Sequence, residues 1–406
     1  MFVRLDAACG PDGRPPGDTP KWARGASKKK MRSAIRTANV FLALLLSYVL
    51  ALPLNAASAA AAPRATRGSH RRLPARYRGV PTFADSTKED LSTFDDPVVR
   101  QAAVDALGRY NGTVVATDPN TGRILAIVNQ KLAFSSGFIP CSTIKPTIAL
   151  AALEENIIRG DTLIKISRRR YMSLTEAMAH SNNEFFEELG RRMGFDTVSR
   201  YGRLMGLGEL AGYGLPEEQP GSFPLAPPQK GGVARMSSYG EGIQMTPLQL
   251  AALTSALANG GTLYYLQYPR TAEDRDQFTP RIKRKLDIEP LLPEIREGML
   301  AAVLYGTGKA SYDREGDEQA LGKTGTCSDE HAKARIGWFT SYADEIHPKI
   351  SLVVFLQGNT RRVKGPMAAV VAGRIYRTLR EKNYFAKSSS SDGRTVVALH
   401  SAGAAH

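Results

Sequence analysis

Histidine and cysteine are scarce in this chain, which has six histidines and three cysteines among its 406 residues. Zinc and other transition metals are held mainly by these side chains at short, regular spacings, and neither His180 nor His331 belongs to such a pattern. A phosphate-binding loop is also missing, because the pattern that ends at residues 322–324 needs a glycine where Asp317 stands. We therefore expect no metal site and no cofactor.

Acidic residues are few in two stretches near the N-terminus. Residues 1–40 hold nine Lys/Arg against three Asp/Glu, and residues 61–80 hold six arginines and no acid, whereas the whole chain has a formal net charge of +15. The remainder is therefore close to neutral. The basic stretches lack interleaved aromatic residues and contain no recognised nucleic-acid motif, which argues against nucleic-acid binding.

The chain has no apolar run of the roughly 20 residues that a membrane-spanning helix prefers. Residues 40–54 form a shorter apolar run that follows a basic stretch and precedes Ala57-Ser58-Ala59, the layout of a secretory signal. The alanine-rich continuation to Ala62 leaves an uncleaved membrane anchor open. We expect an exported protein, either periplasmic or on the outer face of the cytoplasmic membrane.

Three short motifs follow one another in the remaining sequence. Residues 142–145 read S-T-I-K, residues 181–183 read S-N-N, and residues 323–326 read K-T-G-T. We expect Ser142 to open a helix, so that Lys145 lies one turn further on the same face and the unpaired N–H groups of the helix end favour an oxyanion. A second S-x-x-K match, at residues 27–30, lies in the basic leader and is a chance match.

The other two motifs have local contexts of their own. A capping box at residues 173–176 predicts a short helix that ends before the S-N-N turn, and a second helix follows this turn. Residues 323–326 begin a set of antiparallel strands with residues 335–340 and 350–356. On such a strand Gly325 permits the close approach of another backbone, which we expect to be that of a substrate.

Each motif alone also has a purely structural explanation: a helix cap, a capped connection between helices, or a lysine that protects a sheet edge. The set of three in this order favours a site instead. It supplies a nucleophile, a base and an anion-binding strand.

The surrounding pattern predicts an α/β (α+β) fold: a mostly antiparallel sheet covered by helices, with an inserted all-helical lobe and a cleft where lobe and sheet meet. The expected elements are a helix over 96–110, a hairpin of 112–117 with 123–128, a helical block over 142–208, a Pro/Gly-rich loop over 212–232, a helix from Thr246 to Asn259 and a helix over 293–305.

With these motifs the chain resembles penicillin-binding proteins and serine β-lactamases, whose signature is S-x-x-K, S-x-N and K-T-G. Residues 115–128, 238–251, 258–261, 306–310 and 337–339 are similar to transpeptidase domains of high-molecular-mass penicillin-binding proteins. The resemblance implies a penicillin-binding transpeptidase domain over residues 96–385. Composition and charge predict the other parts: a leader with a signal peptide or membrane anchor (1–62), a basic linker (63–95) and a disordered tail (386–406). The 39 positions from Ser142 to Ser181 imply a trimmed helical lobe.

The resemblance also implies a role for each motif residue. Ser142 would be the nucleophile, Lys145 its base, Ser181 a proton relay and Asn183 a holder of the substrate amide. Lys323 would be a further catalytic residue, the neighbouring cation that lowers the pKa of Lys145, and it would also face the terminal carboxylate. Thr324, Gly325 and Thr326 would bind the substrate, and the backbone N–H groups of Ser142 and Thr326 would form an oxyanion hole. The implied ligands are D-Ala-D-Ala stem peptides of peptidoglycan and β-lactams, with a cell-wall synthesis complex as a possible partner.

Three outcomes of the acyl-enzyme stay open. Crosslinking is favoured because the wider segments resemble transpeptidases and the chain has no Glu-x-x-Leu-Asn stretch of the kind that class A β-lactamases use for deacylation. The alternatives are a hydrolase, either a D,D-carboxypeptidase or a β-lactamase closest to the class with a carboxylated lysine, and a penicillin sensor without turnover.

The cysteines that flank the motifs leave another choice open. Cys141 precedes Ser142 and Cys327 follows Thr326, so the two thiols become neighbours if the motifs meet. They form either a disulfide in an oxidising compartment or two unpaired packing residues.

Overall fold

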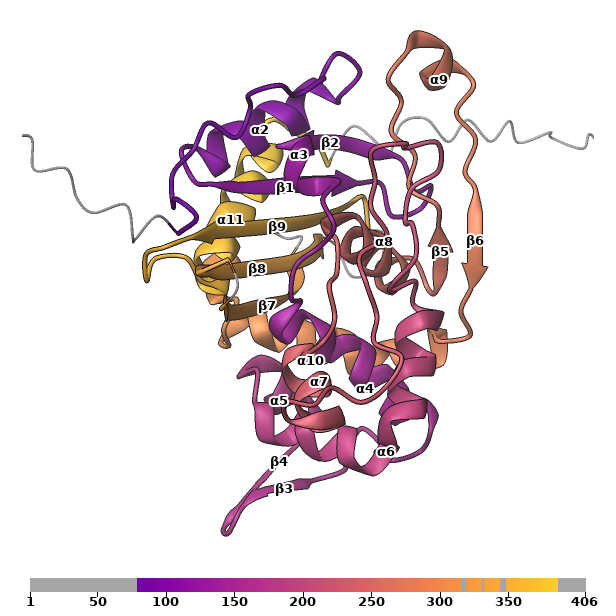
Figure 1. Cartoon of the computed structure of the whole chain (residues 1–406). Helices are drawn as coiled ribbons and strands as arrows, with labels where there is room; N and C mark the ends of the chain where they lie inside the picture. The colour runs from indigo at the N-terminus through magenta and orange to yellow at the C-terminus, as the bar shows by residue number, and fades with distance from the viewer. Residues whose placement is uncertain (1–78, 315–318, 331, 344–347, 386–406) are drawn as a thin grey trace, which may run out of the picture. The chain divides into compact units, whose positions relative to one another are not determined.

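An antiparallel five-stranded sheet is assembled from both ends of the domain. In the computed structural model, which describes residues 79–314, 319–330, 332–343 and 348–385, the strand order is β2-β1-β9-β8-β7 (Figure 1). The strands are β1 (Gly112–Thr117), β2 (Ile124–Val128), β7 (Ala320–Asp329), β8 (Ala334–Ala343) and β9 (Ile350–Gly358). Because β1 pairs with β9, the hairpin before the helical block joins the strands after it, as the sequence predicted.

Helices cover both faces of this sheet. On one face lie α2 (Pro97–Leu107) and α11 (Gly365–Glu381), and on the other lies α8 (Pro247–Ala258) (Figure 1). Alternate residues of each strand enter different clusters: Trp338 packs on the α8 side, whereas Phe339 packs on the side of α2 and α11. The strands therefore read as continuous apolar runs, as expected for a sheet that is buried on both faces.

The inserted lobe lies beside strand β7. Its helices are α4 (Lys145–Glu154), α5 (Leu174–Ala179), α6 (Asn183–Leu204), α7 (Gly232–Tyr239) and α10 (Leu292–Leu304). We expected a wholly helical lobe, but it also carries the hairpin of β3 (Ile164–Ser167) and β4 (Arg170–Met172), which projects from the lobe in Figure 1. The hairpin forms because Ile164 and Met172 pair across it and bury their side chains, while its turn stays polar.

Short elements complete the described part of the chain. They are α3 (Gln130–Ala133), η2 (Cys141–Ile144), β5 (Thr262–Tyr264), α9 (Ala272–Asp276), β6 (Ile282–Lys285), η3 (Glu289–Leu291) and η4 (Lys309–Ser311). Strands β5 and β6 form a separate two-stranded sheet. Among the described residues, no helix has both the length and the apolar character needed to cross a bilayer. The apolar run at 40–54 and the predicted tail at 386–406 lie outside them.

Helix α8 begins and ends where its local sequence predicts. The Thr246 hydroxyl accepts a hydrogen bond from the Gln249 N–H (3.0 Å), and the Gln249 side chain accepts one from the Thr246 N–H (3.0 Å). Pro247 takes the first helical position, where its missing N–H costs nothing, and Asn259 caps the other end. The capping box thus determines where α8, a helix with every residue buried, begins.

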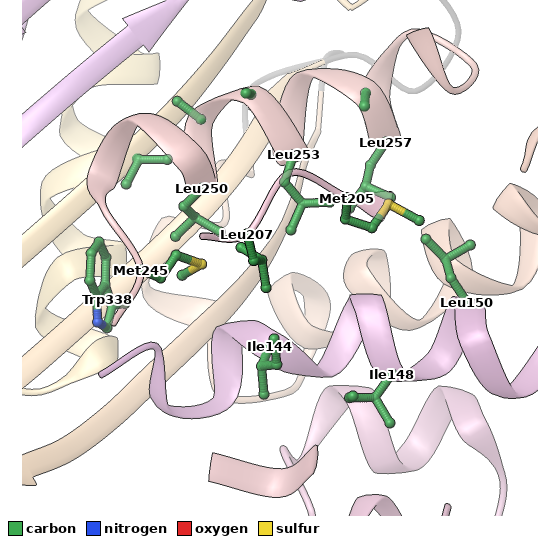
Figure 2. Packing of buried hydrophobic residues seen from close by; sticks show 14 of the residues in the cluster. Ile144, Ile148, Leu150, Met205, Leu207, Met245, Leu250, Leu253, Leu257 and Trp338 are labelled. Atoms are coloured by element: carbon green, nitrogen blue, oxygen red, sulfur yellow. The ribbon is translucent and has the colours of Figure 1, made fainter. Parts of the chain in front are cut away.

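The main core lies between α8 and α4 and reaches the sheet at Trp338. Figure 2 shows Leu250 and Leu253 of α8 facing Ile144 and Ile148, with Leu207 between them. The indole N–H of Trp338 donates to the Ile139 carbonyl (3.0 Å). The chain that leads into the first motif is therefore fixed to the sheet by a buried aromatic side chain.

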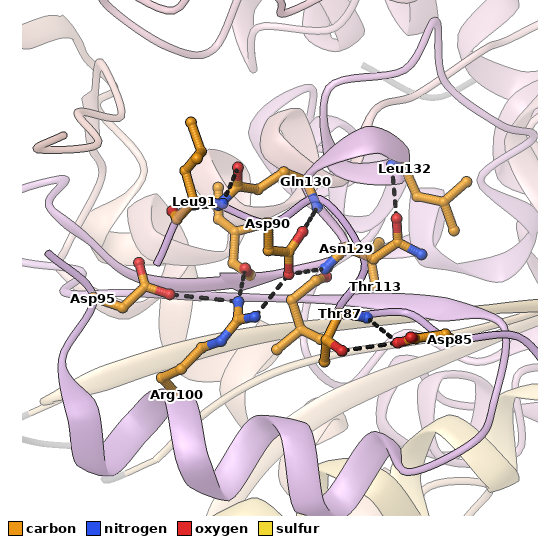
Figure 3. A network of polar contacts seen from close by, with 12 residues as sticks. Asp85, Thr87, Asp90, Leu91, Asp95, Arg100, Thr113, Asn129, Gln130 and Leu132 are labelled. Atoms are coloured by element: carbon orange, nitrogen blue, oxygen red, sulfur yellow. Dashed lines mark hydrogen bonds and ion pairs between the residues drawn. The ribbon is translucent and has the colours of Figure 1, made fainter. Parts of the chain in front are cut away.

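A polar network fastens the segment upstream of α2 to the sheet (Figure 3). The Asp90 carboxylate accepts hydrogen bonds from the backbone N–H groups of Asn129 and Gln130 (both 2.9 Å) and pairs with Arg100 (2.8 Å). Arg100 also lies 3.5 Å from Asp95. Residues 79–95, which the sequence analysis assigned to the linker, thus contact the domain through buried charged groups.

Candidate active site

Ser142 lies in a 3-10 turn and not at the helix N-terminus that we expected. The turn η2 covers Cys141–Ile144, and α4 begins only at Lys145. Pro146 explains the boundary, because proline lacks an N–H and fits only the first turn of an α-helix. Ser142 is half-buried, while the residues on both sides of it are buried. The turn therefore presents the serine from an otherwise closed segment.

The first motif is joined by a hydrogen bond between its two functional groups. The Lys145 amine lies 2.9 Å from the Ser142 hydroxyl oxygen, and its side chain is fully buried. It also contacts the Ser181 carbonyl oxygen (2.7 Å) and the Asn183 side-chain oxygen (2.8 Å). Both of these oxygens can only accept hydrogen bonds. A neutral amine satisfies them with its two N–H groups, which leaves its lone pair for the Ser142 proton.

The second motif is a left-handed turn between α5 and α6, where sequence analysis placed it. Ser181 has φ 54°, and Asn182 caps α6 by accepting from the Phe185 N–H (2.8 Å). This backbone aims the Ser181 hydroxyl at two amines, those of Lys145 (3.2 Å) and Lys323 (2.8 Å). Ser181 thus lies between the first motif and the third.

The third motif lies on β7, whose residues alternate between two environments. The Lys323 amine is buried and contacts the Ser181 hydroxyl and the Thr324 carbonyl oxygen (2.9 Å). Thr324 and Thr326 have their side chains on the other side of the strand, near the start of α11. The predicted residues of all three motifs therefore lie together.

Gly325 is required for a reason that the sequence analysis did not predict. A Cβ atom at this position would lie 3.0 Å from the Pro140 carbonyl oxygen and 3.1 Å from the Thr143 methyl carbon. The close approach is therefore that of the turn bearing Ser142, whereas we had expected the backbone of a substrate there. The turn was missed because it is distant in sequence from the strand, and the approach of a substrate backbone stays a prediction.

The two buried lysines have lowered pKa values. Burial lowers the pKa of Lys145 well below its usual value, and the charge of Lys323 lowers it further, against a smaller opposite effect of Glu184 and Glu187. Burial lowers the pKa of Lys323 to about 7. Both shifts favour the neutral form of each amine relative to that of an exposed lysine.

Cys141 and Cys327 form a disulfide, with their Cα atoms 5.7 Å apart. Of the two possibilities that the sequence left open, the structure has the bond. It links the turn bearing Ser142 covalently to β7, so the first and third motifs are held together across 186 positions of sequence.

Two contacts of β7 involve residues to which the sequence analysis gave no role. The Thr307 hydroxyl lies 2.6 Å from the Thr324 hydroxyl, and the Gly365 N–H donates to the Thr326 hydroxyl (2.8 Å). Thr307 belongs to a segment noted only for its resemblance, and α11 was not predicted. The apolar spacing of Ala368, Ala372, Ile375 and Leu379 was the available signal for that helix.

The described one of the two flanking histidines, His180, does not enter the site. His180 is exposed and lies 3.3 Å from Glu176, one turn earlier on its own helix. His331 lies outside the described residues.

The chain is similar to known proteins in sequence and in fold. The family model described as the penicillin binding protein transpeptidase domain matches residues 112–377. Stage V sporulation protein D of Bacillus subtilis is 29% identical over 286 residues, covering 62% of this chain and 43% of that protein. The peptidoglycan D,D-transpeptidase FtsI of Escherichia coli is 23% identical over 314 residues, covering 66% of this chain and 52% of that protein. The chain thus spans about half the length of these relatives.

A solved structure has a similar fold. It is the D,D-transpeptidase domain of a peptidoglycan glycosyltransferase from Eggerthella lenta, with a TM-score of 0.58 and 20% identity. The similarity covers 71% of this chain and 82% of that one.

Proposed function

The chain belongs to the penicillin-binding protein transpeptidase domain family, and from this premise we propose that it is a serine D,D-transpeptidase. Its substrates are peptidoglycan stem peptides that end in D-Ala-D-Ala, and β-lactams acylate it at Ser142. The names of relatives such as the peptidoglycan D,D-transpeptidase FtsI support peptidoglycan as the substrate. The observation that carries the proposal is the buried Lys145 amine, which lies 2.9 Å from the Ser142 hydroxyl oxygen and is held there by the Ser181 carbonyl and Asn183 side-chain oxygens.

Acylation begins when Lys145 takes the Ser142 proton as the hydroxyl oxygen attacks the carbonyl carbon of the penultimate D-alanine. A serine hydroxyl is a weak nucleophile at neutral pH, so the reaction needs a base that is neutral under the same conditions. Lys145 is suited to this role because burial and the charge of Lys323 lower its pKa. The oxyanion is stabilised by the backbone N–H groups of Ser142 and Thr326, a contribution of about 2.7–4 kcal/mol per donor in other enzymes.

The second half of acylation breaks the bond to the terminal D-alanine. Its nitrogen needs a proton as it leaves, and Ser181 relays one: its hydroxyl gives its proton to the nitrogen and receives in return the proton that Lys145 took from Ser142, so that Lys145 becomes neutral again. The contact with Lys323 keeps the Ser181 hydroxyl oriented during this transfer. The products are a D-alanine and a serine ester of the shortened peptide.

Substrate binding uses the remaining motif groups. Asn183 holds the substrate amide, and Lys323 supplies positive charge to the terminal carboxylate, which the Thr324 and Thr326 hydroxyls receive. Gly325 lets β7 lie directly on the turn that carries the nucleophile. This arrangement aligns the peptide along the edge strand β7.

In the second step the amine of a neighbouring stem peptide attacks the ester, forming the crosslink amide and releasing Ser142. Water in place of the amine would make the protein a D,D-carboxypeptidase or a β-lactamase, and a stable ester without turnover would make it a sensor. We favour the amine because of the family and the names of the relatives.

We also propose that the domain works outside the cytoplasm, in a cell-wall synthesis complex, after export directed by the apolar run at 40–54. The disulfide between Cys141 and Cys327 supports an oxidising compartment. Whether the apolar segment is cleaved or anchors the chain in the membrane is decided by the mass of the exported protein.

Labelling with a fluorescent penicillin tests the acylation. Wild type should become covalently labelled, whereas Ser142→Ala and Lys145→Ala should lose the label because the nucleophile or its base is gone. Lys230→Ala, a change of an exposed lysine paired with Glu330, serves as the matched control and should label normally. Failure of wild type to label, or labelling of Ser142→Ala, contradicts the proposal.

A second assay separates the outcomes of the acyl-enzyme. The purified protein is given a D-Ala-D-Ala peptide with and without an amine acceptor, and the products are identified by mass. A crosslinked product is expected, whereas release of D-alanine without it indicates a carboxypeptidase. Loss of the penicillin label within seconds indicates a β-lactamase, and a lasting label without peptide turnover indicates a sensor.

A further inference from the structure

The two threonines of the third motif are each held by a group outside the three motifs. The Thr324 hydroxyl lies 2.6 Å from the Thr307 hydroxyl, and the Thr326 hydroxyl accepts the N–H of Gly365 (2.8 Å). Thr307 follows α10, and Gly365 begins α11. Neither residue belongs to the proposed machinery, yet both contact hydroxyls that are proposed to receive the substrate carboxylate.

The turn that carries Thr307 is fixed on both sides. The Thr307 N–H donates to the Ala179 carbonyl (3.0 Å), at the end of the helix that precedes Ser181. A Cβ atom on Gly306 would lie 2.2 Å from the same carbonyl oxygen, and one on Gly308 would lie 3.1 Å from the Phe339 ring. Thr307 therefore keeps a constant position relative to the second motif and to β7.

Gly365 is held against β7 just as closely. A Cβ atom there would lie 2.8 Å from the Gly325 carbonyl oxygen and 3.0 Å from the Thr326 hydroxyl oxygen. Only a glycine at this position lets the first N–H of α11 reach that hydroxyl. The start of the helix is therefore placed by the third motif itself.

Proton counting shows what these contacts do for the hydroxyls. Thr326 is exposed and accepts an N–H, so its own proton is directed away from α11. Thr307 and Thr324 have two hydroxyl protons between them, and their mutual hydrogen bond uses one. In the described part of the chain neither hydroxyl has another side-chain partner, so one proton remains for a ligand.

We propose that Thr307, together with the backbone N–H of Gly365, is a positioning group that orients the Thr324 and Thr326 hydroxyls as donors to the terminal carboxylate of the substrate. This inference rests on the proposed function. Thr307 does not touch the reacting atoms and acts through Thr324. Donors that are oriented before binding spend no free energy on reorganisation when the ligand arrives.

The threonines, and not Lys323, determine the direction of the hydrogen bonds to the carboxylate. Its amine already contacts the Ser181 hydroxyl and the Thr324 carbonyl oxygen, so it contributes charge near the carboxylate more than a fixed hydrogen-bond direction. The recognition of carboxylate geometry therefore depends on the two hydroxyls and on what orients them.

The test compares acylation by benzylpenicillin with acylation by its methyl ester, which lacks the carboxylate. Thr307→Val keeps the side-chain shape and removes the hydroxyl. We expect it to slow acylation by the acid about tenfold, the effect of one charge-assisted hydrogen bond, and to change the rate with the ester less than twofold. Thr307→Ser should restore the acid rate because it restores the hydroxyl.

Two controls separate positioning from damage to the fold. If Thr307→Val does not fold, Thr307→Ala is used in its place, and we expect the same ratio of the acylation rates with acid and ester. In a Thr324→Val background, Thr307→Val should have no further effect on the acid rate, because its partner is already gone.

Equal losses with acid and ester, or no loss with the acid, would overturn the role of Thr307 while labelling of wild type still supports the proposed function. Absence of acylation in wild type would overturn both. The two failures are therefore distinguishable in the same experiment.

Discussion

The Lys323 amine lies 2.8 Å from the Ser181 hydroxyl oxygen although 142 positions separate the two residues. The same hydroxyl lies 3.2 Å from the Lys145 amine, so two buried lysines face one neutral group. Two ammonium ions so close in a buried site repel each other strongly, and the loss of one proton removes the repulsion. Which of the two lysines has lost its proton therefore determines whether the site is reactive.

This relationship predicts a pH profile. The acylation rate should rise with pH as Lys145 loses its proton, and Lys323→Met should move this rising limb to higher pH. The sign follows from charge: without a neighbouring cation, the protonated form of Lys145 is less disfavoured and its pKa rises. The measurement is the rate of acylation by the methyl ester of benzylpenicillin between pH 4 and 10, because the ester does not need Lys323 for a carboxylate.

Lys230→Met is the matched control, since this exposed lysine pairs with Glu330 at 3.5 Å and should leave the limb unchanged. If the rising limb of the pH profile stays in place in Lys323→Met, or moves to lower pH, the charge of Lys323 does not lower the pKa of Lys145 as predicted. In wild type, the rate of acylation by benzylpenicillin should also fall above about pH 7, where Lys323 loses its charge. The rate of acylation by the methyl ester should not fall there.

A second prediction concerns the contact between β7 and the turn that carries Ser142. Gly325→Ala places a methyl group 3.0 Å from the Pro140 carbonyl oxygen, which belongs to the backbone and cannot rotate away. We expect a loss of about 1–3 kcal/mol in the free energy of unfolding and slower acylation by penicillin, because the turn must shift. Urea unfolding and the labelling rate measure the two effects.

Gly160→Ala is a suitable control for this change. Its added methyl group would meet only the flexible Glu294 side chain, at 3.3 Å, so both quantities should stay near those of wild type. Wild-type labelling in Gly325→Ala would mean that the turn tolerates the displacement, contrary to the argument from contact distances.

These contacts also indicate what a sequence can and cannot reveal about this fold. The motifs, the hairpin of β1 and β2 and the capped helix α8 were predicted because their signals are local: a capping box, a turn residue, an alternation of apolar side chains. The neighbour of Gly325 and the partner of Thr324 were not, because both come from segments distant in sequence. The 3-10 turn at Ser142 was missed because a serine four residues before a proline that fits the first turn of a helix is also typical of a helix start.

A third prediction concerns the disulfide. Reduction of the bond between Cys141 and Cys327, or the double change Cys141→Ala with Cys327→Ala, should destabilise the domain, because the bond closes a loop of 186 positions. The chain-entropy model gives about 5 kcal/mol as an upper value for such a loop. Thermal unfolding with and without a dithiol reductant measures the effect.

The double variant provides the internal control. Its melting temperature should be lower than that of oxidised wild type and should not respond to the reductant. If the melting temperature of wild type is also unaffected by complete reduction, the bond does not contribute to stability and the prediction is wrong.

The last prediction uses the buried carboxyl of the network in Figure 3. Burial raises the pKa of Asp95 to about 6, although the Tyr268 hydroxyl donates to it (2.6 Å) and the charge of Arg100 opposes the shift. The neighbouring charge of Asp90 contributes in the same direction as burial. Between pH 3.8 and about 6 the folded state holds a proton that the unfolded state has lost, so this group lowers stability as pH rises through that window and has a constant effect above it.

Asp95→Asn should remove this contribution, because an amide does not titrate and can still accept from Tyr268. Its free energy of unfolding relative to wild type should therefore increase from pH 4 to pH 6 and then level off, as measured by urea unfolding at each pH. Asp85→Asn is the control with the opposite sign, since hydrogen bonds from Thr87 lower the pKa of that exposed carboxyl. If the difference in free energy of unfolding between Asp95→Asn and wild type does not vary over this window, Asp95 ionises in the folded domain as easily as in the unfolded chain. Its burial would then not be the cause of any pH dependence.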